Sequence, residues 1–195
     1  MRWIKPGARI TVDETFSRKA HEVEGYDKGT ESKQVLEPML AVIWHSRTGA
    51  AHAMARVIAK GASSSARLIA AEQATADDLL AASGYVFVCP ENLGAMSGLM
   101  KDMFDRLYYP LLGRLEGRPY ATAIAAGSGG QGAQAQIDRI VTGWRLRRIA
   151  EPLIVDLGAQ TPDAILAPKT LPVAAAKTCH DLGTAVGEGL RLGIF

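Results

Sequence analysis

A turn rich in hydroxyl groups and small residues is the first feature of the sequence that suggests chemistry. Its residues are Ser46, Arg47, Thr48, Gly49, Ala50 and Ala51. Free N–H groups and the helix dipole at the start of a helix bind anions, and Arg47 adds a positive charge. The G-x-x-x-x-G-K-[ST] pattern of nucleoside triphosphate sites and the G-x-G-x-x-G pattern of dinucleotide sites are both missing from it. The turn therefore predicts a site for a monophosphate ester, with an ordinary strand-to-helix turn as the alternative.

A second loop combines a polar amide with apolar side chains and two glycines. Its residues are Pro90, Glu91, Asn92, Leu93, Gly94, Ala95, Met96, Ser97 and Gly98. The glycines allow the backbone to approach a flat ligand closely, and Asn92 can both donate and accept hydrogen bonds. Leu93 and Met96 are suited to pack against an apolar ring face. The loop predicts contact with a planar heterocycle, and a wide loop with a helix cap at Ser97 is the alternative.

Four glycines in six positions mark a third loop. Its residues are Gly127, Ser128, Gly129, Gly130, Gln131 and Gly132. Glycine loses more backbone entropy on folding than any other residue, so such a loop implies that something approaches its backbone. A flexible connection is the alternative. If the three loops share one edge of a sheet, they predict a pocket that holds a phosphate and encloses a planar heterocycle.

Apolar strands that alternate with helices must position these loops. Strands are expected over residues 39–45, 66–72, 84–90, 117–127 and 151–158. Helices are expected over residues 52–62, 75–82, 99–112, 135–150 and 171–193. The alternation predicts an α/β fold, with a doubly wound, five-stranded parallel sheet in a three-layer α/β/α arrangement. In such sheets ligands bind outside the carboxyl ends of the strands, where the three loops would lie.

Length and composition indicate one globular domain with an extension before it. Residues 1–38 hold seven acidic and seven basic residues without a clear strand or helix period. We expect them to form an N-terminal extension, partly disordered or packed on the surface, before a domain over residues 39–195. The net charge of +2 shows no imbalance typical of nucleic-acid binding. No apolar run reaches the roughly 18 residues of a membrane span.

The cysteines and the first residues predict a cytoplasmic protein. Cys89 and Cys179 are 90 positions apart and form no metal-type cluster, which fits free thiols in a reducing compartment. The first residues contain no apolar stretch typical of a secretory signal. Cys89 is expected to be a buried, inert thiol, and His45 to support the end of a strand. A solvated helix end is expected at Arg145, Arg147 and Arg148.

Three segments resemble the flavodoxin-like superfamily, and most of all its branch of NAD(P)H-dependent FMN reductases and quinone reductases. The segments read IWHSRTGAAHAMARVIAKGA, GYVFVCPENLGAMSGLMKDMFDR and AIAAGSGGQGA. The resemblance implies a flavodoxin-like fold and one non-covalently bound flavin mononucleotide (FMN). It implies that residues 46–51 take the FMN phosphate, that residues 90–98 hold the isoalloxazine ring, and that residues 127–130 close the other side. Ala50 and Ala51 depart from the family pattern, which commonly has polar residues there, so weaker phosphate binding is expected.

The resemblance also implies a reaction. NAD(P)H would donate electrons to FMN, and a quinone or similar small molecule would accept them. The cofactor carries this chemistry, so no catalytic residue is assigned. The alternatives are a flavodoxin-like electron carrier, which the net charge of +2 disfavours because carriers dock through complementary charge, and a scaffold that has lost flavin. The family and the apolar stretch Leu107–Leu112 predict a homodimer or higher homo-oligomer.

Overall fold

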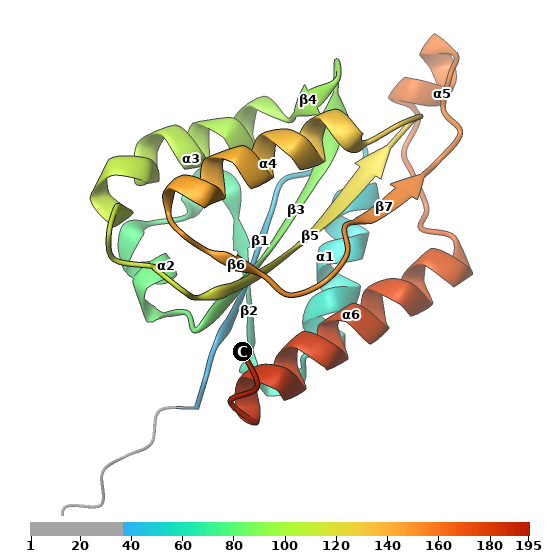
Figure 1. Cartoon of the computed structure of the whole chain (residues 1–195). Helices are drawn as coiled ribbons and strands as arrows, with labels where there is room; N and C mark the ends of the chain where they lie inside the picture. The colour runs from blue at the N-terminus through green and yellow to red at the C-terminus, as the bar shows by residue number, and fades with distance from the viewer. Residues whose placement is uncertain (1–36) are drawn as a thin grey trace, which may run out of the picture. The chain divides into compact units, whose positions relative to one another are not determined.

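The computed structural model describes residues 37–195, and its centre is a twisted parallel sheet (Figure 1). The strands are β1 (Leu40–Trp44), β2 (Ala66–Ala70), β3 (Gly84–Asn92), β5 (Pro119–Ala126), β6 (Arg147–Arg148) and β7 (Leu153–Asp156). Their order is β2-β1-β3-β5-β6, and β7 also pairs with β5, so that two short strands share the last position. The predicted five-position, doubly wound sheet is therefore confirmed.

Helices cover both faces of the sheet. They are α1 (Ala50–Gly61), α2 (Ala76–Ala81), α3 (Gly98–Leu111), α4 (Gln131–Gly143), α5 (Pro162–Leu166) and α6 (Val173–Arg191), with short 3-10 turns η1 (Ser63–Ser65) and η2 (Ala71–Gln73). Figure 1 shows α1 and α6 on one face and α2, α3 and α4 on the other. This is the three-layer arrangement that the alternation of strands and helices predicted.

The apolar run of β1 explains why the sheet is covered on both sides. Leu40 and Val42 pack into the core under α1 and α6, whereas Ala41 and Ile43 pack into the core under α3 and α4. Successive side chains of a strand point to opposite faces, so a central strand needs apolar residues at every position. The four side chains are fully buried, as a continuous apolar run predicts.

The register of the central strands creates the edge on which ligands can bind. Trp44 at the end of β1 pairs with Val88 of β3, and the N–H of His45 donates to the carbonyl of Val88 at 3.0 Å. After β1 the chain crosses to α1 on one face, and after β3 it crosses to α3 on the other. The carboxyl ends of β1 and β3 therefore flank a topological switch point, where a crevice opens in this class of sheet.

The local structure differs from the predicted elements in three places. The second loop forms a tight hairpin, because Glu91 and Asn92 pair with the short antiparallel strand β4 (Ala95–Met96). α4 begins at Gln131, inside the predicted third loop, and ends at Gly143, where the buried Trp144 donates its indole N–H to the Tyr108 carbonyl at 3.0 Å. α5 was not predicted at all.

Of the arginine cluster, Arg145 lies at a helix end as expected, whereas Arg147 and Arg148 do not. Arg145 has a left-handed φ of 54° and follows α4, whereas Arg147 and Arg148 form β6 beside β5. The guanidinium of Arg148 forms an ion pair with Asp138 of α4 and lies over the Tyr120 ring, 5.7 Å from its centroid. Arg148 therefore fastens a sheet edge to α4.

The expectations about residues 1–36 concern a part of the chain outside the described residues. Within residues 37–195 no helix is long and apolar enough to cross a membrane. The same residues contain no group of three or more His, Cys, Asp or Glu side chains that could hold a metal ion.

Candidate functional site

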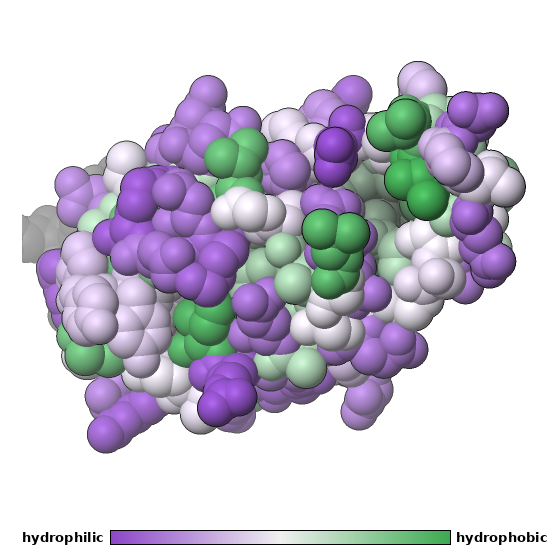
Figure 2. All heavy atoms as spheres, turned by 90° about the horizontal axis from the view of Figure 1, so that it is seen from above, coloured by the Kyte–Doolittle hydropathy of each residue, from purple (hydrophilic) through white to green (hydrophobic). Residues whose placement is uncertain are grey.

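A cavity of about 290 Å³ opens at the carboxyl ends of β1, β3 and β5. Figure 2 looks onto this edge of the molecule, where hydrophobic side chains stand on both sides of a hollow. Nine of the residues predicted from the three loops line the cavity: Ser46, Arg47, Thr48, Ala50, Ala51, Pro90, Glu91, Asn92 and Gly127. The volume is at the lower end of the roughly 300–1,000 Å³ typical of small-molecule sites.

The first loop brings the N-terminus of α1 to this cavity. Gly49 precedes the helix with a left-handed φ of 100°, and its N–H donates to the Ser46 hydroxyl at 3.0 Å. No side chain of residues 37–195 caps α1, so within this part of the chain its first N–H groups are free to bind a ligand. Ala50 and Ala51 are only 2% and 1% exposed, because their methyl groups pack into the core. The alanines therefore contribute backbone donors to the cavity, while their side chains support the helix.

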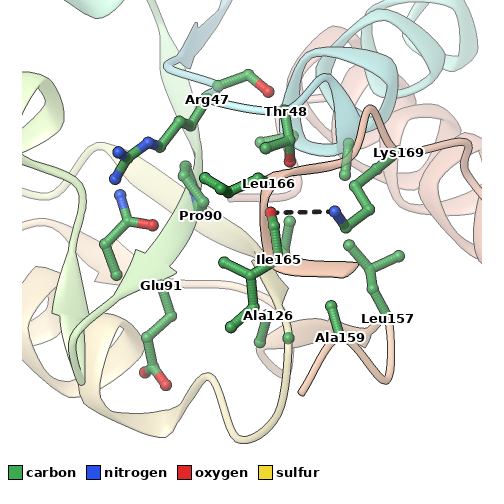
Figure 3. A pocket seen from close by; sticks show the side chains of 16 residues that line it. Arg47, Thr48, Pro90, Glu91, Ala126, Leu157, Ala159, Ile165, Leu166 and Lys169 are labelled. Carbon is green, nitrogen blue, oxygen red and sulfur yellow. Dashed lines mark hydrogen bonds between the residues drawn. The ribbon is translucent and has the colours of Figure 1, made fainter. Parts of the chain in front are cut away.

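Arg47 supplies the positive charge expected at this turn. Its side chain is exposed and, among residues 37–195, makes no ion pair or side-chain hydrogen bond within the distances that define one. Figure 3 shows Thr48 next to α1, with the Arg47 side chain extending from the same turn towards the end of β3. A cation beside unpaired N–H groups makes this side of the cavity suited to an anion.

Of the hairpin formed by the second loop, the first strand, at the end of β3, lines the cavity, and β4 does not. Leu93 and Gly94 form its tip, with φ angles of 53° and 72°, and Leu93 is fully exposed. Met96 is buried, and its N–H donates to the Gln136 side chain at 3.0 Å. Six predicted residues thus lie away from the cavity lining: Leu93, Gly94, Ala95, Met96, Ser97 and Gly98. In particular, the Met96 side chain is in the core rather than free to pack against a ring.

The third loop meets the hairpin rather than the cavity. The Glu91 carboxylate accepts hydrogen bonds from the N–H groups of Gly130 and Ala133, each at 2.9 Å, and so caps α4. A Cβ atom on Gly132 would lie 2.0 Å from the Gly94 carbonyl oxygen. The close approach that the glycines predicted is therefore made by the protein's own hairpin. Gly127 lines the cavity, whereas Ser128, Gly129 and Gly130 do not.

The wall of the cavity opposite the hairpin was not predicted from the sequence. That wall comes from the ends of β5 and β7 and from α5, and its residues are Ala125, Ala126, Leu157, Ala159, Ile165, Leu166 and Lys169. Figure 3 shows Ile165, Leu166 and Leu157 around the opening. A signal for α5 was present in the sequence, because Thr161 caps it and Pro162 stands at its first turn.

Lys169 holds this wall in place. Its ammonium group donates to the carbonyl groups of Ala164, Ile165 and Ala167, at 2.5, 3.2 and 2.6 Å. One of these bonds is dashed in Figure 3. The N–H of Lys169 also donates to the Thr48 carbonyl at 2.7 Å. The segment after β7 is therefore fastened to the predicted phosphate turn.

Two titratable groups lie behind the cavity and outside its lining. The Nδ1 atom of His45 is hydrogen-bonded to the buried Ser97 hydroxyl at 2.8 Å, which links the end of β1 to the start of α3. Burial lowers the pKa of His45, and the nearby Glu72 carboxylate partly offsets this effect. Burial also raises the pKa of the Cys89 thiol to about 12. Cys89 is fully buried, which confirms the buried thiol expected at this position.

Comparisons with known proteins agree with this architecture. Residues 68–154 match the family model described as NADPH-dependent FMN reductase. A flavodoxin from Aquifex aeolicus (strain VF5) is 33% identical over 105 residues, which are 52% of this chain and 57% of that flavodoxin. The chain thus spans little more than half the length of this curated relative.

Solved structures show the fold at lower identity. A flavodoxin from the domain Archaea superposes with a TM-score of 0.63 at 17% identity, covering 78% of this chain and 99% of that chain. A flavodoxin, WrbA-like protein from Agrobacterium tumefaciens superposes with a TM-score of 0.59 at 22% identity, covering 80% of this chain and 98% of that chain. The chain therefore has the flavodoxin-like fold, and its central part matches the NADPH-dependent FMN reductase family model.

Proposed function

We propose that the cavity binds FMN and that the protein is an FMN-dependent oxidoreductase. The observation that carries the proposal is the meeting of two chemistries in one cavity: the uncapped N-terminus of α1 beside Arg47, and the apolar residues of α5 and of the ends of β5 and β7. The first suits a phosphate monoester and the second suits a flat aromatic ring. The residues present thus fit the cofactor that the fold implies.

Each part of the cavity has a separate task in this proposal. The N–H groups at the start of α1 and the Ser46 and Thr48 hydroxyls would bind the phosphate. The backbone from Pro90 to Asn92 would orient the polar edge of the ring, and the apolar side chains opposite would exclude water from its face. When bound, the flavin supplies the redox chemistry that no side chain of the cavity offers.

The proposed reaction takes electrons from NAD(P)H to a quinone or a similar small molecule. The match of residues 68–154 to the NADPH-dependent FMN reductase family supports a nicotinamide donor. The second candidate is an electron carrier without a nicotinamide site, which the 33% identity to a flavodoxin favours. A carrier that docks on basic partners needs an acidic face, and the net charge of +2 argues against this.

Anaerobic mixing of the FMN-loaded protein with NADH or NADPH tests the reaction. The reductase proposal predicts that the visible flavin absorbance bleaches and returns when a quinone is added. If neither nicotinamide bleaches the flavin but dithionite does, the carrier replaces the reductase. Free FMN at the same concentration, without protein, is the control for uncatalysed reduction.

Self-association remains part of the proposal. Within the stretch Leu107–Leu112, Leu107 and Leu111 pack in the core, whereas Tyr109 and Leu112 are exposed. These two exposed side chains offer an apolar patch at the C-terminal end of α3 for a second copy of the chain. Light scattering of the purified protein would give the mass of the assembly, and a mass of one chain would contradict self-association.

A further inference from the structure

The α5 side of the cavity exposes apolar side chains that the fold itself does not require. Ile165 and Leu166 line the cavity, yet their side chains are 51% and 67% exposed, and neither belongs to the two buried cores. Figure 3 shows both beside the opening. Neighbouring apolar side chains at the mouth of a cavity gain stability when a ligand removes them from water.

α5 is too short to keep this position by helix propensity alone. It contains five residues, far fewer than an isolated helix needs in water. Its position is therefore set by its ties. The Thr161 hydroxyl accepts from the Ala164 N–H at its start, and the Lys169 ammonium binds three carbonyl groups at its end. The Lys169 N–H to the Thr48 carbonyl then joins α5 to the turn before α1.

The two cations of the cavity lining differ in their surroundings. Three carbonyl oxygens already surround the Lys169 ammonium, whereas Arg47 makes no ion pair with residues 37–195. An ammonium held by three acceptors has little capacity left for a phosphate, because it carries three donors in all. Lys169 is therefore placed to fix α5, and Arg47 is placed to attract an anion.

We propose that α5 forms the wall of the ring subsite, with Ile165 and Leu166 contacting the flavin ring and Lys169 acting as a positioning residue that holds this wall. The inference rests on the proposed FMN binding and assigns the α5 residues to the ring rather than to the phosphate. It distinguishes the roles of the two cations, and it predicts which flavins each substitution affects.

Riboflavin, which has the ring but no phosphate, provides the test. The dissociation constants of FMN and riboflavin would be measured for the full chain by quenching of flavin fluorescence. Variants would be Lys169→Met and the double variant Ile165→Ser/Leu166→Ser. Controls of the same type, both on the exposed surface of α6, are Lys177→Met and Val173→Ser. Thermal unfolding would establish that each variant is folded, which is expected since the two α5 side chains are largely exposed.

The expected result is an equal effect on both flavins. The double variant should raise the dissociation constants of FMN and riboflavin by about tenfold or more, because the flavin loses apolar contact area. Lys169→Met should weaken the binding of FMN and of riboflavin by about three- to tenfold, and the factor should be similar for the two flavins. The control variants should leave both dissociation constants unchanged.

Other outcomes identify which claim fails. If Lys169→Met weakens FMN but not riboflavin, the ammonium contacts the phosphate and the positioning role is overturned. If the α5 variants bind both flavins as tightly as the wild-type chain, α5 is not a wall of the ring subsite. If the wild-type chain binds neither flavin, the proposed function itself fails.

Discussion

The carboxylate of Glu91, at the end of β3, accepts a hydrogen bond from the N–H of Gly130, in the turn before α4, at 2.9 Å. The same carboxylate accepts from the Ala133 N–H, so it neutralises the positive end of the α4 dipole. Figure 3 shows the Glu91 side chain pointing away from Leu166 and Ile165. Two of the loops predicted to hold a ligand are thus bonded to each other, which fixes the hairpin strand that borders the cavity.

Removing this carboxylate should destabilise the protein. We expect Glu91→Ala to lower the free energy of unfolding by about 1–2 kcal/mol, because two N–H groups of α4 lose their acceptor. Glu91→Gln should lower the free energy of unfolding by less, since the amide keeps one acceptor oxygen. Urea unfolding followed by circular dichroism measures both values, and equal stability of all three proteins would contradict the capping role.

The glycine at position 132 is predicted to be required for packing. Gly132→Ala should destabilise the protein by about 1–3 kcal/mol, since the new Cβ would overlap the Gly94 carbonyl oxygen. Gly98→Ala is the matched control, because Gly98 also lies in the first turn of a helix but has open space around it. That control should be neutral or stabilise by up to about 1 kcal/mol. Equal thermal midpoints for the two variants would refute the packing explanation.

Arg47 is predicted to act on the phosphate alone. Arg47→Ala should raise the dissociation constant of FMN by up to about fivefold. The effect is modest because the side chain is exposed and solvent screens its charge. Riboflavin binding should not change, and added salt should reduce the difference between wild type and variant for FMN. A loss of affinity for riboflavin equal to that for FMN would show that Arg47 acts on the ring or on the fold instead.

The half-buried His45 should make stability depend on pH. Burial lowers its pKa in the folded protein below the ordinary value of 6.5, so the unfolded chain binds the proton more readily. His45 therefore contributes full stability above pH 6.5, and this contribution falls as the pH drops from there towards the lower folded-state pKa. His45→Asn keeps a hydrogen-bonding atom near Ser97 but has no titration in this range. The free energy of unfolding of wild type should fall more than that of the variant between pH 8 and pH 5.5. Parallel curves would contradict this assignment.

The sequence carried enough information to predict the sheet, because its signal is local and strong. β1 and β3 are continuous apolar runs, and each is followed by the small and polar residues that turn the chain into a helix. The predicted turn at residues 46–51 lies at the cavity for the same reason, since strand ends at one edge of a parallel sheet must converge. The sequence also predicted the buried state of Cys89 from its place at a strand end.

The rest of the site depends on contacts between distant segments. The glycines near Gly130 predict the close approach of a ligand, but the group that approaches them is the Glu91 carboxylate, 39 positions earlier. α5 has five residues and no regular apolar period, and it is held by Lys169 and the Thr48 carbonyl. The bond to the distant Thr48 carbonyl leaves no local pattern in the sequence, although Thr161 and Pro162 mark the start of α5. The burial of the Ala50 and Ala51 methyl groups also depends on contacts with other segments, so it could not be predicted from the sequence.

The most direct test of the central claim is the flavin content of the full chain. The protein would be purified, incubated with excess FMN, desalted, and its visible absorbance compared with its protein concentration. We expect about one FMN retained per chain, because the α1 N-terminus and the ring wall lie in one cavity. If no flavin is retained, and if titration followed by fluorescence also shows no saturable FMN binding, the cavity is not a flavin site and the chain is a flavodoxin-like scaffold without the cofactor.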